Sequence, residues 1–542
     1  MPTFYTSLRA QHRHSRPVSE YVADRAPSDS YPKHTSLHKL RNALLEHFTP
    51  IQQKSFKIKP NRKIVVIGAG LAGLCAAYEL KKLDYDVSVY EARYRVGGRA
   101  FSFRLGNKVV EGGGELIGRN HPLWCGYAQS FGLKFSDVFD YGNSPIRFNG
   151  RTLSFEDSQA LADAMEPHME RLNHLADSIV DPFEPWTNGN SAWLDRTSLA
   201  TWLNSLRCTT KSSREGRDAV EQQLVADNGR SARGQSLLGV LAMIKGHGVD
   251  RYWVDTEVYR CIGGNEQLAR RFRKKLEDDV HTGIKVTAIT EKGGSVSVEL
   301  AYTTDRDEEE DLEAGLYWRK PRTAKRKPLK TVQADDVILA VPPSVWHLIR
   351  FNNSDLRTKL HTAPELGVNT KNLFSLKSRF WQSFSSSPNL TDSVGPADMT
   401  WETTEDMHHP RRKTNRNKKP NFAFVAFSGA GHSQALVNKR SDQAREATLL
   451  DQLRRVYPGI DAEVIDSKFM NWPKKHFTKG SYYFPAPKEV RAWGPFWKTG
   501  YMDWLHFAGE HTSYAFMGYM EGALSSGFRL AHRLAVRDKL LP

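Results

Sequence analysis

The stretch from residue 64 to residue 91 constrains the fold more than any other part of the chain. An apolar, β-branched run at Ile64–Ile67 leads into the glycine-rich turn GAGLAG at 68–73, and an alanine- and leucine-rich segment follows. A second apolar run, Val87–Tyr90, ends at Glu91. This order predicts a strand, a helix and a second strand. Together they form a βαβ unit of about thirty residues with the glycine pattern of dinucleotide-binding folds.

The three glycines of this turn have separate physical roles. Gly68 permits the tight turn after the strand, Gly70 lets the backbone approach a pyrophosphate, and Gly73 lets the helix pack closely on the strand. Leu71 and Ala72 begin the helix, whose free N–H groups and positive dipole end favour a bound phosphate. The turn therefore predicts a binding site for the pyrophosphate of a dinucleotide.

The residues after the second strand indicate which dinucleotide is bound. Glu91 ends that strand, where a carboxylate can accept hydrogen bonds from both ribose hydroxyls and would repel a 2′-phosphate. The chain continues through Ala92-Arg93 to Val96-Gly97-Gly98-Arg99, which gives the pattern E-A-R-x-x-x-G-G-R. This extension resembles the flavin amine oxidase family, whose members bind FAD rather than NAD at this position.

The resemblance continues in family order along most of the chain. The matching blocks are VEGGGELIG at 110–118, CIGGN at 261–265, VILAVPP at 337–343, TK at 370–371, GSY at 480–482 and FAGEHTSYAFMGYMEGALSSG at 507–527. The resemblance implies an α/β fold in which a Rossmann-type FAD-binding domain is interleaved with an α+β substrate-binding domain. We expect a polar N-terminal leader at 1–59, the FAD-binding domain at 60–122, 248–343 and 476–535, and the substrate-binding domain at 123–247 and 344–475. Interleaving would put the ligand cleft at the domain interface, a usual place for such sites.

The resemblance also implies which residues would hold FAD. They are Gly68, Gly70, Leu71, Ala72, Gly73, Glu91, Ala92, Arg93, Gly98, Arg99, Gly114, Glu115, Val286, Trp472, Gly509, Glu510, Met520 and Ala523. Val286 either matches a position that contacts the adenine or is plain strand core. Trp472 matches the tryptophan that packs on the dimethylbenzene edge of the flavin. Ser481 stands where monoamine oxidases carry the cysteine that bonds to the flavin, so we expect non-covalent FAD.

Three residues match positions that carry chemistry in the family. Lys371 corresponds to the lysine that holds a water against flavin N5, and burial there would let its amine relay protons and assist O₂ activation. Tyr482 and Tyr519 correspond to the aromatic cage of monoamine oxidases, which guides an amine toward the flavin and attracts a cationic amine by cation–π interaction. A surface lysine and two core tyrosines are the structural alternatives.

Leu116 marks a departure from L-amino-acid oxidases, which carry at this position an arginine that clamps the substrate carboxylate. Leucine cannot form this clamp, although Arg119 or an arginine of the substrate-binding domain could replace it. Glu115 could anchor a distal cationic group of a diamine or basic amino acid, or it could be a loop carboxylate bonded to backbone N–H groups. We therefore assign Glu115, Arg119, Tyr482 and Tyr519 to the substrate site.

These residues predict a flavin-dependent oxidase of a C–N bond. A hydride leaves the carbon that bears a neutral amine, the imine hydrolyses to a carbonyl and ammonia, and O₂ is reduced to H₂O₂. A primary amine or an L-amino acid is the expected substrate, and a polyamine oxidase is the alternative within this enzyme class. A chromatin- or nucleic-acid-docked demethylase-like protein is the alternative from a different class.

The charge of the chain bears on that last alternative. The formal net charge is +16, and much of the excess lies in two runs, WRKPRTAKRKPLK at 318–330 and HHPRRKTNRNKKP at 408–420. We interpret both runs as solvated loops and expect no specific nucleic-acid partner. No segment approaches the roughly eighteen apolar residues of a membrane span. The 4 cysteines lack metal-ligand spacing, which indicates reduced thiols and no metal site. Reduced thiols favour a cytoplasmic location. A homodimer is compatible with the sequence.

Hydrophobic periodicity predicts further elements around the nucleotide-binding unit. Helices are expected at 37–48, 124–131, 153–179, 198–206, 218–226, 234–244, 266–276 and 521–533, and strands at 284–289, 296–302, 334–343, 372–376, 422–427 and 506–508. Gly293 and Gly294 predict a hairpin turn between the first two of these strands.

Overall fold

The computed structural model describes residues 4–10, 62–106, 108–138, 143–304, 331–384, 386–403 and 422–541. The helix expected at 37–48 and the basic runs at 318–330 and 408–420 lie outside these residues. Within the leader, the described helix α1 (Phe4–Ala10) packs against the long helix α6 (Phe155–Asp177). No helix among the described residues combines the length and the apolar composition that crossing a bilayer requires.

A parallel sheet forms the nucleotide-binding half of the fold. Strand β1 (Lys63–Ile67), helix α4 (Leu71–Lys81) and strand β2 (Asp86–Glu91) form the βαβ unit that the sequence predicts. In the described residues this sheet has five strands, all parallel, in the order β20-β13-β1-β2-β9. The other strands are β9 (Val280–Thr282), β13 (Asp336–Leu339) and β20 (Leu505–Phe507). Strands far apart in sequence therefore build one sheet, as an interleaved α/β fold requires.

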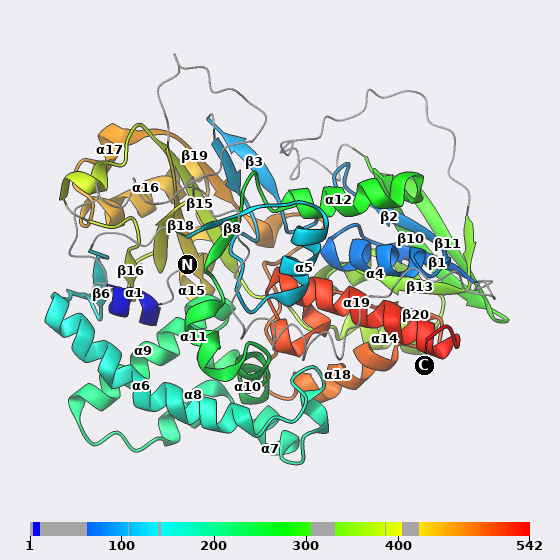
Figure 1. Ribbon diagram of the computed structural model, residues 1–542, viewed down its shortest axis with the longest axis horizontal. Coiled ribbons are helices and arrows are strands. Elements are labelled where there is room, and N and C mark those ends of the chain that lie inside the picture. The colour runs from blue at the N-terminus through cyan, green and yellow to red at the C-terminus, as the bar shows by residue number, and fades with distance from the viewer. Residues whose placement is uncertain are drawn as a thin grey trace.

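Helix α4 is buried between two other helices. Both α12 (Glu266–Leu276) and α19 (Met520–Arg537) pack against it (Figure 1). The close approach depends on glycine, because a Cβ at Gly527 of α19 would lie 2.3 Å from the carbonyl oxygen of Ala72 in α4. This contact fixes α4 and α19 relative to each other.

A second sheet contains the predicted hairpin. Its strands β10 (Ile284–Lys292) and β11 (Ser295–Tyr302) pair antiparallel, and β12 (Val332–Ala334) and β14 (Arg350–Phe351) complete it. Gly293 and Gly294 form the turn with φ of +61° and +84°, which glycine adopts without strain, so the hairpin is confirmed. Strand β14 lies in the segment 344–475, which the sequence assigns to the substrate-binding domain, yet it pairs with β10. The chain therefore still belongs to this second sheet at residues 350–351, before it enters the larger sheet.

A larger sheet, with seven strands in the described residues, forms the other half of the fold. Its order is β19-β15-β18-β17-β16-β6-β7, and only β16 and β6 pair in parallel. The strands are β6 (Ile146–Phe148), β7 (Arg151–Thr152), β15 (Asn369–Leu376), β16 (Thr391–Asp392), β17 (Met399–Glu402), β18 (Phe422–Gly429) and β19 (Val464–Met470). Every residue of β15 is buried, which puts Lys371 in the interior.

A layer of helices lies beside the larger sheet (Figure 1). It includes α6, α9 (Lys211–Asn228) and α10 (Leu237–Gly246), and α6 is a single helix that contains Pro167. A Cβ at Gly216 of α9 would lie 2.0 Å from the carbonyl oxygen of Ala164, so α6 and α9 are in close contact. Further elements are β3 (Ser102–Leu105), β4 (Lys108–Glu111), α5 (Pro122–Ser130), β5 (Phe135–Asp137), α7 (Ser191–Arg196), α8 (Leu199–Ser205), α11 (Tyr252–Asp255), β8 (Tyr259–Cys261), α14 (Ser354–His361), α15 (Ala430–Val437), α16 (Asp442–Arg454) and α17 (Ile460–Glu463).

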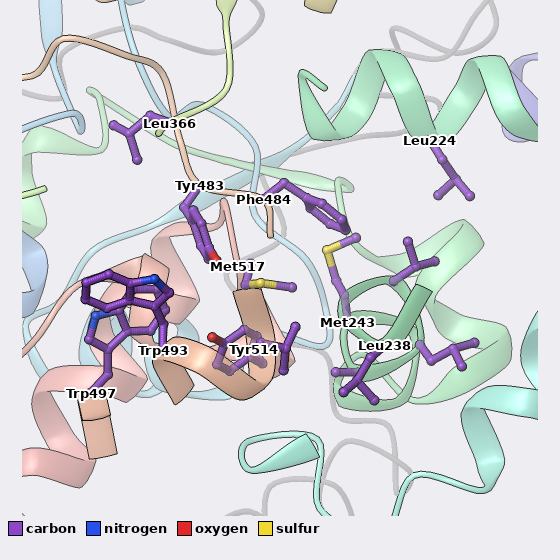
Figure 2. Packing of buried hydrophobic residues seen from close by; sticks show 14 of the residues in the cluster. Leu224, Leu238, Met243, Leu366, Tyr483, Phe484, Trp493, Trp497, Tyr514 and Met517 are labelled. Atoms are coloured by element: carbon purple, nitrogen blue, oxygen red, sulfur yellow. The ribbon is translucent and has the colours of Figure 1, made fainter. Parts of the chain in front are cut away.

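Helix α18 (Glu489–Thr499), which the sequence analysis does not predict, contributes to a buried core. Figure 2 shows Tyr514 between the tryptophans of α18 and the side chains of α10. The ring of Trp497 lies 6.0 Å from that of Tyr514 and 5.4 Å from that of Tyr483, measured between centroids. Met517 belongs to the same core. The core therefore joins α10, α18 and the two segments around residues 483 and 517.

Candidate active site

A cavity of about 530 Å³ lies at the carboxyl ends of β1 and β2, the edge at which parallel α/β sheets bind ligands. Its walls also include the starts of α4 and α19 and part of β15. The predicted residues that line it are Gly68, Gly70, Leu71, Ala72, Glu91, Ala92, Arg93, Gly98, Arg99, Gly114, Glu115, Val286, Lys371, Trp472, Tyr482, Gly509, Glu510, Tyr519, Met520 and Ala523. Gly73 lies instead at a packing contact, since a Cβ there would be 2.1 Å from the carbonyl oxygen of Gly68.

The glycine turn forms one part of the cavity wall. Gly68 has a φ of +104°, and a Cβ there would lie 2.8 Å from the carbonyl oxygen of Ala340, the residue after β13. A Cβ at Gly70 would meet nothing within 4 Å, and no side chain caps α4, so its first N–H groups face open space. Glu91 accepts hydrogen bonds of 2.8 Å from the N–H groups of Ala69 and Arg93, which fix its carboxylate at the end of β2.

The start of α19 forms a second uncapped helix end. Met520 and Ala523 line the cavity there, and α19 has no side-chain cap. Glu510 holds the preceding turn, because it accepts hydrogen bonds from Arg99 Nη1 at 2.7 Å and from the N–H of Gly518 at 2.9 Å. Two open helix ends and a fixed carboxylate are the groups that the pyrophosphate, ribose and ring of FAD require, so the residues present fit this cofactor.

Tyr482 and Tyr519 line another part of the cavity. The ring of Tyr482 lies against Gly518, where a Cβ would come within 3.1 Å of ring atom Cδ2. Tyr483 and Met517, the neighbours of this pair along the chain, belong to the core in Figure 2. The same packed core thus supports the backbone of both tyrosines.

The carboxylate of Glu115 lies at the centre of a buried network of donors. Its Oε2 accepts a hydrogen bond of 2.8 Å from Lys371 Nζ, and its Oε1 accepts from Arg260 Nε at 2.9 Å, Trp401 Nε1 at 2.9 Å and Thr403 Oγ1 at 2.8 Å. These are side-chain donors, not the backbone N–H groups considered from the sequence. Both oxygens of Glu115 therefore have hydrogen-bond partners within the protein, and Lys371 is one of them.

Two neighbouring carboxyl groups have opposite pKa shifts. Burial alone would raise the pKa of Glu115, but Lys371 and Arg260 outweigh this effect and lower the pKa to about 2. At Glu111, burial raises the pKa to about 8, and the charge of Glu115 adds to the rise, although the N–H of Asn265 opposes it. Glu115 is therefore ionised at neutral pH, whereas Glu111 is mostly protonated.

Arg119 does not line the cavity. Its Nε donates to the Tyr259 hydroxyl at 3.0 Å, its Nη1 pairs with Asp255 at 3.2 Å, and its side chain is 44% exposed. The chain turns away after Gly118, which directs Arg119 outward and not toward the expected substrate site. Leu116 does line the cavity, so the wall has leucine where L-amino-acid oxidases carry an arginine.

Four residues at or beside the cavity are not predicted from the sequence: Arg260, Trp401, Asp227 and Glu257. Arg260 lies in β8 next to the matching block CIGGN, and this adjacency was an available signal. Trp401 lies on β17, whose residues are all buried, so no alternation of polarity marks it. Asp227 and Glu257 line the cavity from the end of α9 and just after α11, where acidic residues are ordinarily solvated.

Fold and cavity together define a flavin-dependent oxidoreductase with a buried lysine and an aromatic pair in its site. Comparison with known proteins identifies the family. The family model described as flavin containing amine oxidoreductase matches residues 71–535. The chain therefore belongs to the flavin-containing amine oxidoreductases, and its cofactor is FAD.

Similar proteins match nearly the whole chain. A probable flavin-containing monoamine oxidase A of Dictyostelium discoideum is 22% identical over 495 residues, which are 88% of this chain and 98% of the relative. Flavin-containing amine oxidase B of Homo sapiens is 24% identical over 488 residues, 87% of this chain and 85% of the relative.

Solved structures have the same fold. A putrescine oxidase bound to putrescine aligns with a TM-score of 0.71 at 22% identity, covering 88% of this chain and 99% of that chain. Cyclohexylamine oxidase from Brevibacterium oxydans IH-35A aligns with a TM-score of 0.72 at 21% identity, covering 89% of this chain and 100% of that chain.

Replacement of Glu111 by glutamine should remove one pH dependence of stability. The folded protein keeps the proton of this carboxyl up to about pH 8, whereas the unfolded chain loses it above its ordinary pKa of 4.5. The wild-type protein should therefore lose stability relative to Glu111→Gln as pH rises from about 5 to 8, by up to a few kcal/mol, and no further above pH 8. Melting temperatures of both proteins across this range measure the difference.

Glu170→Gln, at an exposed position of α6, is the control, and its difference from wild type should not change with pH in this window. A pH-independent difference for Glu111→Gln as well would mean that the Glu111 carboxyl is already ionised in the folded protein.

Proposed function

We propose that the protein is an FAD-dependent oxidase of primary amines that uses O₂ and binds its cofactor non-covalently. The observation that carries this proposal is that Lys371, Tyr482 and Tyr519 line the same cavity as the two open helix ends. Leu116 supports an amine over an L-amino acid, because it offers no charge to a substrate carboxylate. The names of the two similar structures, which refer to putrescine and cyclohexylamine, support the same class of substrate.

The chain would hold FAD through groups already described. The turn at 68–73 and the start of α19 would bind its anionic and ring portions, and Glu91 its ribose hydroxyls. When bound, FAD supplies a two-electron acceptor that can pass its electrons to O₂. Ser481 supports non-covalent binding, because serine has no thiolate, and its hydroxyl lies 2.8 Å from the carbonyl oxygen of Gly367.

Tyr482 and Tyr519 would orient the amine between their rings. Burial raises the pKa of both phenols well above the ordinary value, and nearby carboxylates raise it further. The phenols therefore stay neutral and act as walls of the site, not as bases.

Lys371 would hold one water molecule in a fixed position, from which protons can be transferred. The ion pair with Glu115 fixes Nζ, and Nζ also lies 5.3 Å from the ring centroid of Trp401, so the ammonium has little freedom. A water bound to a fixed donor keeps one position in the cavity, which favours proton transfer in one direction.

The overall reaction balances with water and O₂ as the other reactants. The substrate carbon gives up a hydride and its nitrogen a proton, which leaves an imine. Water hydrolyses the imine to a carbonyl compound and ammonia. O₂ takes up two electrons and two protons and leaves as H₂O₂. The nucleic-acid-docked alternative rests on net charge alone, since both basic runs lie outside the described residues.

The purified protein should release its FAD intact on denaturation. Serine at position 481 cannot form the thioether that a cysteine could form. After acid precipitation, the flavin should appear in the supernatant and match FAD by mass and absorbance. Flavin that stays with the precipitated polypeptide would contradict the non-covalent proposal.

Lys371→Met should slow flavin reduction by substrate, flavin reoxidation by O₂, or both, by about a hundredfold or more, while FAD stays bound. Stopped-flow absorbance of the flavin measures each half-reaction separately. Lys377→Met is the matched control, because Lys377 is exposed just after the same strand β15, and its rates should equal those of wild type. Loss of FAD from Lys371→Met, or unchanged rates, would assign Lys371 to structure alone.

Peroxide release on a panel of substrates tests the proposed activity. We expect benzylamine or putrescine to have a higher kcat/KM than L-arginine, L-phenylalanine and L-glutamate. L-Glutamate should be the poorest, because its side-chain carboxylate would face the carboxyl groups that line the cavity. Repulsion between like charges in a desolvated cavity costs several kcal/mol, which lowers kcat/KM on the order of a thousandfold. If L-glutamate has the highest kcat/KM, a carboxylate clamp exists and amines are not the substrate class.

A further inference from the structure

We infer that the carboxylate of Glu115 fills an anion-binding site built into the cavity wall, and that it thereby excludes substrates that bring a carboxylate of their own. Glu115 is then a specificity-determining residue, because the donors that hold it are the donors that a small carboxylate would need. The part of the inference that concerns substrates rests on the proposed amine oxidation, whereas the anion site itself does not.

The donors around the Glu115 carboxylate are sufficient to bind one anion. Two of them are cations, the ammonium of Lys371 at 2.8 Å and the guanidinium of Arg260 at 2.9 Å. The other two are Trp401 Nε1 at 2.9 Å and Thr403 Oγ1 at 2.8 Å. Although burial opposes ionisation, the two cations hold the pKa of this carboxyl at about 2. Two cations thus face a single carboxylate, and the site is strongly positive without it.

Arg260 needs more acceptors than the described residues provide. Its Nε donates to Glu115 and its Nη2 to the carbonyl oxygen of Glu402 at 2.6 Å, but within the described part of the chain its Nη1 has no partner. The side chain is only 1% exposed, so water from the bulk does not replace the missing acceptor. Without Glu115, Nε would join Nη1 as a buried donor without a partner, which favours an acceptor supplied from solution.

The site should keep its shape when the Glu115 side chain is shortened. Lys371 and Trp401 lie on strands β15 and β17, whose residues are all buried. The backbone of Glu115 has its own support, because the buried amide of Asn265 donates to the carbonyl oxygens of Gly114 and Glu115 at 2.9 and 2.8 Å. Neither the donors nor the backbone therefore depend on the carboxylate alone for their positions.

The Glu115 side chain lies between the cavity and two of the donors. Glu115, Lys371 and Trp401 line the cavity, whereas Arg260 and Thr403 are not among its lining residues. Shortening Glu115 to alanine would add the volume of its Cγ and carboxyl group to the cavity and bring the remaining donors within reach of a ligand. The removed portion has the size and charge of acetate.

In the wild-type protein this anion site is filled from within. A substrate carboxylate that approached it would find the four donors already engaged and would meet the negative charge of Glu115 at short range. An amine without a carboxylate meets no such repulsion. The same side chain therefore fixes Lys371 and favours amines over α-amino acids.

Binding of acetate tests the anion site without any turnover. Acetate should raise the melting temperature of FAD-loaded Glu115→Ala by about 2 °C or more relative to chloride at equal ionic strength, because a ligand that binds the folded state stabilises it. Acetamide, which has nearly the same shape and no charge, should not do so. Glu170→Ala, at an exposed position of α6, is the control, and acetate should change its melting temperature no more than that of wild type.

A double variant separates the anion site from a general effect of acetate on a weakened protein. Glu115→Ala/Arg260→Met lacks both members of a buried ion pair, which is less destabilising than the loss of one member. Acetate should raise its melting temperature by less than half as much as that of Glu115→Ala. Equal effects of acetate and acetamide on Glu115→Ala, or equal effects of acetate on the single and double variants, would overturn the anion site.

Glu115→Gln tests specificity, since it keeps the size of the side chain and removes its charge. L-Phenylalanine and 2-phenylethylamine differ only in the carboxylate. The ratio of their kcat/KM values, amino acid over amine, should rise by about tenfold or more from wild type to this variant. An unchanged ratio would overturn the role of Glu115 in specificity, and this ratio alone decides if Glu115→Ala does not fold. Absence of H₂O₂ from wild type with every amine would overturn the proposed function, while acetate binding would still decide on the anion site.

Discussion

One buried carboxylate, that of Glu115, connects the two halves of this molecule. It follows β4 on the nucleotide-binding side and accepts hydrogen bonds from Arg260 on β8, Lys371 on β15 and Trp401 on β17. The Glu115 and Arg260 side chains are 2% and 1% exposed, so the pair is cut off from water. Removal of one partner from such a pair leaves an uncompensated buried charge at a cost of about 3–5 kcal/mol. The position of Lys371 is thus coupled to the correct assembly of both sheets.

The polar groups of the cavity are distributed unevenly. Partial positive charge gathers at the starts of α4 and α19, where no side chain caps the helix. Carboxyl groups gather beside the tyrosines, at Asp227 and Glu257. An anionic cofactor would therefore meet partial positive charge at both helix starts, whereas the phenols beside the carboxyl groups are neutral.

The sequence was most informative where a local pattern has a local cause. The βαβ unit, the hairpin at Gly293 and the helix at Glu266–Leu276 follow from glycine geometry and from periodicity, and the structure has all three. The partners of Glu115 could not be predicted in this way, because Arg260 and Trp401 come from segments that are distant in sequence. Helix α18 was missed because a glycine and a proline interrupt its pattern, although packing of Trp493 and Trp497 in the core stabilises it.

The shared support of Tyr482 and Tyr519 has a consequence for how substrate range can change. Tyr483 and Met517 pack in one core with α10 and α18, so the separation of the two rings is set by close-packed side chains and not by loop motion. If the two rings flank the reacting amine, as proposed, their fixed separation would limit the width of the group that carries it. Substrates with a wider group at that position would require repacking of that core, at a cost to folding, whereas exchanges elsewhere on the cavity wall would leave the core intact. Substrate range should therefore change first through wall residues outside that core.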